Sequence, residues 1–299
     1  MPELPEVLTY LETLKPRIVG RPLEKVRVRS PSLLRTFDPP VSALEGRTLR
    51  NLERIGKRIV WALDDDLFAV FHLMITGRFR WKERGAPVPR KLGHAGFDFP
   101  TGTLLLTEAG TQKRASLHVV RGRGALDEFR RGGIDPLTAS PEAFRDALLR
   151  ENRTLKRALT DPRIVDGIGN AHSDEILHRA RLSPTRRTHQ LEDDEIERLH
   201  TAAREELLEW IERRRRDAGG EVPERVSAFH PAMAVHGRYG EPCPRCGSPI
   251  QRIRYAANET NYCPTCQTGG RLLADRALSR LLGDDWPRTL EELEELKAR

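Results

Sequence analysis

The first residues of the chain, Met1-Pro-Glu-Leu-Pro-Glu-Val7, could supply an amine nucleophile beside an acid. Methionine aminopeptidases cut before small residues, and removal of Met1 would expose the secondary amine of Pro2. An α-amino group titrates near ~8, against ~10.4 for lysine, so a useful fraction is unprotonated at neutral pH. Attack on a carbonyl carbon would give a cationic iminium, and Glu3 could carry the proton. Taken alone, the same residues are better explained as a cap on a helix expected at 6–18.

Four cysteines near the other end of the chain have the spacing of a metal site. They form two C-x-x-C pairs, Cys243/Cys246 and Cys263/Cys266, separated by about one hairpin, and the chain has no other cysteine. This spacing is typical of a zinc ribbon, in which tetrahedral Cys₄ coordination leaves no open position for catalysis. Nothing at the start resembles a signal peptide, so a structural Zn²⁺ in a reducing cytoplasm is favoured over disulfides.

The composition favours an acidic partner. The 299 residues include 51 Lys and Arg against 44 Asp and Glu, a formal net charge of +7. A basic surplus favours phosphate contact, although a solvated basic face is the ordinary alternative. The apolar runs are too short to span a bilayer, so no membrane partner is expected.

The chain changes pattern along its length, which predicts an α+β architecture. After the helix at 6–18, short strands are expected at 26–28, 58–63, 67–73, 103–107 and 115–120, as in a sandwich or barrel. The stretch 131–136 reads as a linker. Helices are then expected near 141–150, 153–160, 171–180 and 192–216, followed by the ribbon and by a charged helical tail that breaks at 284–287.

A glycine turn lies between two of the expected helices. Gly167-Ile-Gly-Asn170 can form a tight turn, and the backbone amides at the start of the following helix could face an anion. Together with Lys156 and Arg157 on the preceding helix, this pattern favours a phosphate clamp over a turn used only for packing.

The opening motif, the Gly-Ile-Gly-Asn turn and the Cys₄ ribbon, in this order, resemble the formamidopyrimidine-DNA glycosylase / endonuclease VIII family, and the opening residues are closer to the formamidopyrimidine branch. The resemblance covers roughly residues 1–270. It implies an N-terminal β-sandwich with flanking helices (1–135), a helix–two-turn–helix domain (136–235) and a zinc-ribbon finger (236–270), with 271–299 as a helical extension. It also implies damaged DNA as the partner and a monomeric, cytoplasmic protein.

The resemblance assigns roles residue by residue. Pro2 matches the nucleophile, Glu3 the proton-shuttling acid, Lys57 a catalysis-supporting, phosphate-binding lysine and Asn170 a phosphate-holding asparagine, while Glu6 matches a supporting acid. The residues expected to contact DNA are Lys57, Met74, Ile75, His94, Thr111, Lys113, Lys156, Asn170, Arg254 and Asn258.

Some positions depart from the formamidopyrimidine branch. An arginine expected five residues before the third cysteine is Asn258, and Arg252 or Arg254 on the preceding strand could compensate, or both could be solvent-facing. Of the three residues that fill the hole left by a flipped base, the first falls on Ile75, beside Met74. The other two, an arginine and a phenylalanine in that branch, fall near Thr111 and Lys113, where there is no aromatic residue, so the expected wedge is reduced to the apolar Met74 and Ile75. The segment 218–234, where the family has a lesion-capping loop, is short.

Two classes of function follow. The first is a bifunctional glycosylase and abasic-site lyase that acts through a Pro2 Schiff base with β,δ-elimination, on oxidised purines or on oxidised pyrimidines, single-stranded or bulky damage. The second is a non-catalytic damaged-DNA-binding protein on a glycosylase scaffold. The intact Pro2, Glu3 and Lys57 favour the first.

Overall fold

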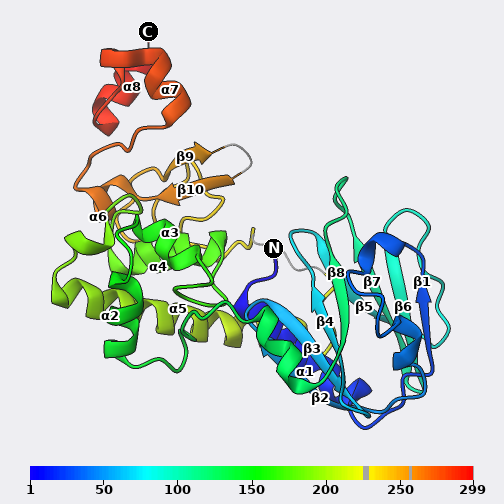
Figure 1. Cartoon of the computed structure of the whole chain (residues 1–299). Helices are drawn as coiled ribbons and strands as arrows, with labels where there is room; N and C mark the ends of the chain where they lie inside the picture. The colour runs from blue at the N-terminus through cyan, green and yellow to red at the C-terminus, as the bar shows by residue number, and fades with distance from the viewer. Residues whose placement is uncertain (225–228, 256–257, 299) are drawn as a thin grey trace. The chain divides into compact units, whose positions relative to one another are not determined.

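The computed structural model describes residues 1–224, 229–255 and 258–298. The chain forms two compact units, one comprising Met1–Arg131 and Glu209–Ser227, the other Gly132–Leu208 and Ala228–Arg299 (Figure 1). The domain boundaries expected at 135, 235 and 270 stay a prediction. Among the described residues, no helix has the length and apolar character needed to cross a membrane.

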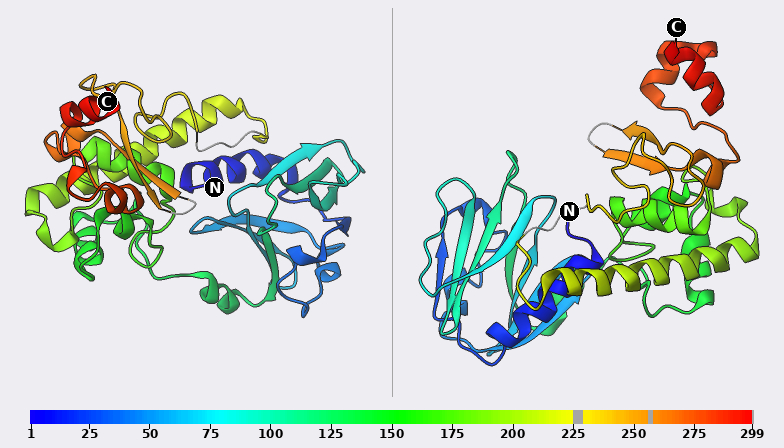
Figure 2. Two further views of the ribbon diagram at one scale, coloured as in Figure 1. Left: turned by 90° about the horizontal axis from the view of Figure 1, so that it is seen from above. Right: turned by 180° about the vertical axis from the view of Figure 1, so that it is seen from behind.

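The first unit contains two antiparallel four-stranded sheets (Figures 1 and 2). One has the strand order β1-β6-β7-β5, with β1 at Lys25–Val28, β6 at Gly93–Phe99, β7 at Gly102–Glu108 and β5 at Gly77–Lys82. The other has the order β2-β3-β4-β8, with β2 at Leu49–Ile55, β3 at Arg58–Leu63, β4 at Leu67–His72 and β8 at Ser116–Arg121.

Aromatic side chains from both sheets meet in one core. Trp61 and Phe71 come from the second sheet and Phe97 from the first, and the Trp61 and Phe97 ring centroids are 5.2 Å apart. The helix α1, Leu4–Ile18, adds its buried face to this core. Face-to-face sheets with a shared core form a sandwich, so the predicted fold class is confirmed.

Short 3₁₀ helices cover further parts of the sandwich, at Pro31–Leu33 (η1), Val41–Leu44 (η2) and Arg123–Phe129 (η3). From η3, Leu126 and Phe129 pack in a second cluster with Phe68 and Val70 of β4. Both faces of the second sheet are therefore buried, which explains why β3 and β4 are almost wholly apolar.

The second unit is built from helices and one hairpin. Its helices are α2 (Pro141–Leu149), α3 (Leu155–Thr160), α4 (Asn170–Ala180), the first part of α5 (Asp193–Ala218), α6 (Pro264–Thr268), α7 (Arg276–Leu282) and α8 (Leu290–Ala298), with 3₁₀ turns η4 (Thr188–Gln190) and η5 (Gly283–Asp285). The hairpin pairs β9 (Gln251–Tyr255) with β10 (Asn258–Tyr262). The four helices expected between 141 and 216 and the break in the tail lie within two residues of their predicted bounds.

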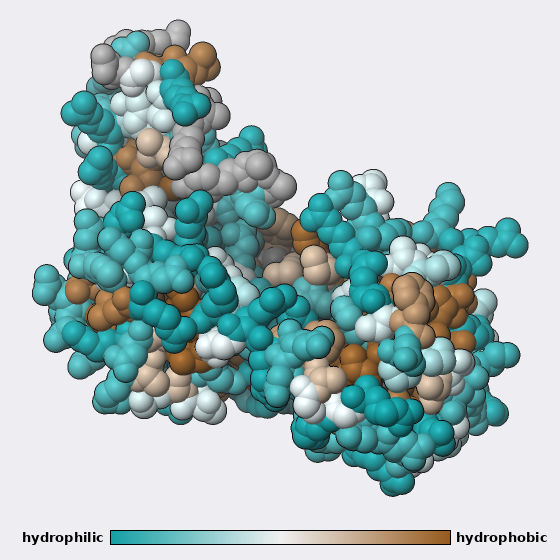
Figure 3. Space-filling model, in the orientation of Figure 1, coloured by the Kyte–Doolittle hydropathy of each residue, from teal (hydrophilic) through white to brown (hydrophobic). Residues whose placement is uncertain are grey.

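Hydrophilic residues cover most of the visible surface of each unit (Figure 3). This agrees with the low share of hydrophobic residues, 38%, in the whole chain.

Candidate active site

The N-terminal residues lie in a buried corner of the first unit. Pro2 is buried and Glu3 is only 3% exposed. The backbone N–H of Glu3 donates to Glu6 Oε2 at 2.8 Å, and Arg214 Nε donates to Glu6 Oε1 at 2.9 Å. Both oxygens of Glu6 are therefore engaged in holding the start of α1. A supporting role was predicted for Glu6. In the structure, Glu6 holds the backbone of the residue next to Pro2.

The electrostatic surroundings of this corner favour a neutral amine. Burial lowers the pKa of the Met1 α-amino group from its ordinary value, and the positive charges of Arg78 and Lys57 lower it further, against the opposing effect of Glu3 and Glu6. A neutral amine is the nucleophilic form. The first unit therefore brings Lys57 and Glu3 within electrostatic reach of the chain's first amine, and their catalytic roles stay a prediction.

Lys57 is placed by a two-residue hairpin turn. Ile55 at the end of β2 pairs with Arg58 at the start of β3, so Gly56 and Lys57 form the turn. Gly56 has φ 58°, and a type II′ turn needs a residue with positive φ at this first position. The turn presents Lys57 at the end of the sheet rather than along a strand.

His72, at the end of β4, lies in the same electrostatic environment as Lys57. Its Nδ1 accepts a hydrogen bond from the Met74 backbone N–H at 3.2 Å. Burial lowers the pKa of His72 to about 4, with Arg58 and Lys57 adding to the effect. The ring is therefore neutral at physiological pH.

We predict that His72 makes the fold sensitive to acid. Because its folded pKa is about 4 and an unfolded histidine titrates near ~6.5, the unfolded chain alone gains this proton as the pH falls between these values. The free energy of unfolding should fall across that window, by up to ~1.4 kcal/mol per pH unit. Denaturant titrations at several pH values should show that the unfolding free energy of His72→Gln depends less steeply on pH. His189 is exposed, so His189→Gln should keep the pH dependence of the unaltered protein. An unchanged pH dependence in His72→Gln would contradict the role given to His72.

Two loops that were expected to contact DNA lie together in the first unit. The loop between β4 and β5 presents Ile75, which is 53% exposed, next to Met74, whose φ of 52° is uncommon for a residue other than glycine. Thr76 Oγ1 accepts the backbone N–H of Gly110 at 3.1 Å, which joins this loop to 109–115. Of the predicted apolar wedge, Ile75 is therefore exposed and Met74 is half buried, and both lie beside the loop that carries Thr111 and Lys113.

A buried carboxylate, Glu108, organises the loop 109–115. Its side chain is 1% exposed and accepts the backbone N–H groups of Arg114 and Ala115 at 3.0–3.1 Å. Its Oε2 is 2.8 Å from Nε2 of His94, which is also 1% exposed. The Lys113 ammonium donates to the Glu108 carbonyl oxygen. The loop is thus folded around Glu108.

This arrangement bears on two of the expected DNA contacts. A direct contact from His94 would require the buried pair with Glu108 to open, so it stays a prediction that this conformation does not favour. Lys113 is half buried and already bonded, whereas Thr111 is exposed. The sequence reasoning missed Glu108. An acid at the end of the apolar run Leu104–Leu106 was the available signal, since buried carboxylates need partners.

In the second unit, α4 begins at Asn170 after the glycine turn, where Gly167 has φ 85°. The Asn170 side-chain amide donates to the Glu259 carbonyl of β10 at 3.0 Å. Lys156 Nζ donates to the Asn170 carbonyl at 2.6 Å and to Asp174 Oδ1 at 2.5 Å. Asn170 and Lys156 are therefore brought together, as expected, and both already have protein partners. Phosphate binding by these two residues stays a prediction.

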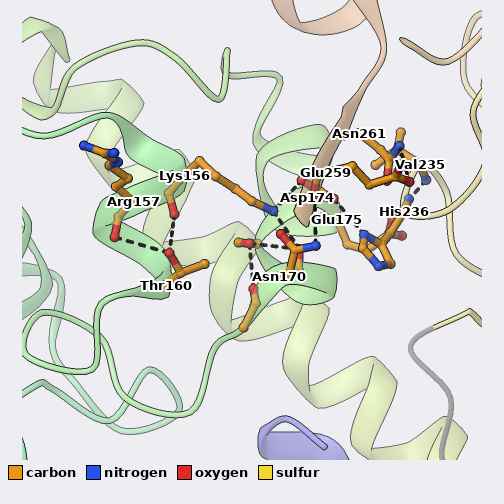
Figure 4. Close-up of polar contacts among 12 residues, drawn as sticks. Lys156, Arg157, Thr160, Asn170, Asp174, Glu175, Val235, His236, Glu259 and Asn261 are labelled. Carbon is orange, nitrogen blue, oxygen red and sulfur yellow. Dashed lines mark hydrogen bonds and ion pairs between the residues drawn. The ribbon is translucent and has the colours of Figure 1, made fainter. Parts of the chain in front are cut away.

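The ion pair continues into a buried network that ties α4 to the segment before the ribbon. In Figure 4 the side chains of Lys156 and His236 both point toward Asp174, and His236 Nδ1 is 2.7 Å from Asp174 Oδ2. The next residue, Glu175, accepts three backbone N–H groups, from residues 234, 235 and 236, at 2.6–2.9 Å. Asp174 and Glu175 thus act as anchors for residues 234–236, a role that the sequence reasoning missed.

The β9–β10 hairpin presents the remaining expected contacts. Asn258 and Arg254 both have exposed side chains. Arg252, in contrast, lies over the Tyr239 ring at 4.2 Å from its centroid and is 3.5 Å from Glu259, so it is half buried. Of the two arginines on β9, only Arg254 is available to compensate for the asparagine at 258. Residues 225–228 of the short segment 218–234 lie outside the described residues.

The four cysteines converge on one point of the second unit. Their Sγ atoms all lie within 4.8 Å of one another, with Cys246 and Cys263 3.4 Å apart and Cys243 and Cys266 4.0 Å apart. Tetrahedral zinc with Zn–S bonds of ~2.3 Å requires sulfur atoms ~3.8 Å apart, so the four thiolates fit one structural Zn²⁺. His178 Nε2 lies 3.3 Å from Cys243 Sγ and can donate to the thiolate, as outer-shell partners of metal sites do.

We predict one tightly held zinc per chain. Because the cluster joins two short knuckles with little core of their own, metal binding should stabilise the ribbon, and chelation should unfold it. Loss of the hairpin should weaken DNA binding by about tenfold or more, since its contacts are lost as a unit. Elemental analysis and titration of binding before and after chelation check this. Zinc-free purified protein, or disulfides between these cysteines, would contradict it.

Three family models match successive parts of the chain. These are the formamidopyrimidine-DNA glycosylase N-terminal domain over residues 1–115, the formamidopyrimidine-DNA glycosylase H2TH domain over 133–219, and the zinc finger found in FPG and IleRS over 240–269. Their order is the order of the sites described above.

Curated relatives and solved structures carry the same name. The formamidopyrimidine-DNA glycosylase of Geobacillus kaustophilus is 36% identical over 282 residues, which cover 89% of this chain and all of that protein. The Lactococcus lactis Fpg in complex with DNA containing an abasic site has a TM-score of 0.78 and 29% identity, covering 89% of this chain and 99% of that one. MutM (Fpg) from Thermus thermophilus has a TM-score of 0.76 and 34% identity, covering 89% and 98%.

Proposed function

Because this chain belongs to the formamidopyrimidine-DNA glycosylase family, we propose that it is a bifunctional DNA glycosylase and abasic-site lyase of base excision repair. Its substrate is damaged DNA, on which it acts as a monomer in the cytoplasm. The observation that carries the catalytic part is the buried N-terminal corner that holds Pro2 and Glu3, where burial also lowers the pKa of the Met1 α-amino group.

In the proposed reaction, the target nucleotide leaves the stack and the Pro2 nitrogen attacks C1′ of its sugar. The bond between C1′ and the base breaks, and the base leaves with the bonding electrons and a proton. Glu3 carries protons during ring opening and these transfers. The resulting iminium acidifies the C2′ proton, and β- and then δ-elimination break the C3′–O and C5′–O bonds. Lys57 and Asn170 hold the neighbouring phosphates.

The lesion preference follows from the two loops of the first unit. An arginine–phenylalanine wedge is absent at Thr111 and Lys113, so holding an everted base in stacked duplex should cost more, since unstacking takes a few kcal/mol. The alternative is that Met74, Gln112 or Arg114 fills the hole after a loop shift. For Gln112 or Arg114, such a shift would have to disturb the bonds that Glu108 makes to 114 and 115, which argues against these two residues.

We therefore predict robust cleavage at abasic sites, weak discrimination of the base opposite the lesion and comparatively poor excision of 8-oxoguanine paired with cytosine. Single-turnover rates on an abasic-site duplex and on 8-oxoguanine opposite each of the four bases measure all three. The missing wedge should reduce excision less on single-stranded and bubble substrates than on duplex substrates, because the bases in them are already unstacked. Fast excision opposite cytosine with sharp rejection opposite adenine would show that another side chain does the work of the wedge. Absence of cleavage at the abasic site would contradict the proposed function itself.

A further inference from the structure

The last residues of the chain lie beyond the family models, the last of which ends at residue 269. We propose that this extension, residues 271–298, is a buttress that holds the β9–β10 hairpin, and that Asp275 is its principal positioning residue. The hairpin carries Arg254 and Asn258, which are expected to contact DNA. The effect of the buttress on DNA binding therefore rests on the proposed function, whereas its structural role does not.

The hairpin needs such support because it is a two-stranded sheet. Among the residues that the structure describes, β10 is the one strand that pairs with β9, so the other edge of β9 presents N–H and C=O groups with no neighbouring strand there. A hairpin of two strands is marginally stable on its own in water. The backbone N–H and C=O groups at such an edge cost free energy when they are buried without hydrogen-bond partners. The buried face of this hairpin is short, with Ile253 opposite Thr260 and Gln251 opposite Tyr262.

Asp275 supplies the missing partner at the edge of β9. Its side chain is 5% exposed, and its Oδ2 accepts the backbone N–H of Arg254 at 2.8 Å. Asp275 also precedes α7 and accepts the Ser279 backbone N–H through its own carbonyl at 2.7 Å. One residue therefore joins the strand that bears the exposed Arg254 side chain to the first helix of the extension.

A second connection reaches the other strand. The hydroxyl of Tyr262, at the end of β10, accepts the Leu273 backbone N–H at 2.8 Å. Tyr262 is 1% exposed, and burial raises its pKa to about 12, so it stays a neutral phenol. The Leu272 N–H donates to the Arg288 carbonyl at 2.8 Å, which closes the extension on itself. Both strands of the hairpin are thus bonded to the segment 273–275, and this segment is held by the rest of the extension.

The test compares Asp275→Ala with Asp275→Asn in the full-length protein. The alanine removes the acceptor, whereas asparagine keeps an oxygen that can accept the Arg254 N–H. Amide hydrogen exchange should become about tenfold faster at Arg254 and its hairpin neighbours in Asp275→Ala, because the buried hydrogen bond that holds the Arg254 N–H is lost. Asp275→Asn should restore most of the protection. Asp285→Ala, which removes an exposed acid of the same extension, should leave exchange unchanged.

Affinity for duplex DNA with a stable abasic-site analogue gives the second readout. Asp275→Ala should weaken binding several-fold while the excision rate at saturating protein stays unchanged, with zinc content equal in all variants. Unchanged exchange in Asp275→Ala would overturn the buttress. Faster exchange with unchanged DNA affinity would overturn its positioning role. If the unaltered protein binds no damaged DNA, the proposed function fails while the exchange data still decide the structural claim.

Discussion

A Glu3→Gln protein is expected to bind abasic DNA with unchanged affinity and to lose about 10²–10⁴-fold in base excision. The substitution keeps the size of the side chain and removes the group that carries the proton. Glu3 is 3% exposed beside the N-terminal amine, where an amide cannot exchange protons at neutral pH. The backbone of residue 3 should stay in place, because its N–H is held by Glu6.

Single-turnover excision rates and equilibrium binding separate the two effects. Glu221→Gln is the matched control, since Glu221 is an exposed acid of the same unit that pairs with Arg17. Its excision rate should equal that of the unaltered protein. If Glu3→Gln excises bases at the normal rate, another group carries the proton. If it loses binding in proportion to rate, Glu3 acts in binding and not in proton transfer.

The second large effect is expected when the Pro2 nitrogen is blocked. A short Gly-Ser extension that remains attached before Pro2 converts the amine into an amide, which cannot form an iminium. Abasic-site cleavage should fall by on the order of 10³-fold or more, as when other enzymes lose their nucleophile. The same extension at the C-terminus should leave cleavage unchanged. Pro2→Gly should retain a fraction of the activity at most, because a primary amine remains. Full activity with the blocked N-terminus would exclude Pro2.

The helices could be predicted from sequence because their signals are local. Ser140 caps α2 through its hydroxyl, and the glycine turn precedes α4 directly. The metal site was equally readable, since the spacing of four cysteines alone defines it. The chemistry of Pro2 and Lys57 needed the family resemblance, because a buried corner with a lowered amine pKa depends on contacts from α5 and β5, far along the chain.

Three strands, β2, β5 and β6, were not predicted. In β6, Gly93 and Gly96 lack side chains that favour strands, and their role appears only in three dimensions. A Cβ on Gly96 would come within 3.1 Å of the Arg27 and Val88 side chains, so this glycine admits the ion pair between Arg27 and Asp98. The buried acids Glu108, Glu175 and Asp275 were likewise not predicted from the sequence. Each is explained by backbone groups that it meets after folding, which no local pattern encodes.

The central claim is that the Pro2 nitrogen forms the Schiff base, and borohydride trapping tests it most directly. The protein is incubated with abasic-site DNA and borohydride, and the cross-linked peptide is identified by mass spectrometry. We expect a stoichiometric adduct on the N-terminal peptide, with the DNA remnant on the Pro2 nitrogen. An adduct on Lys57 or another lysine, or trapping undiminished by the N-terminal extension, would contradict it.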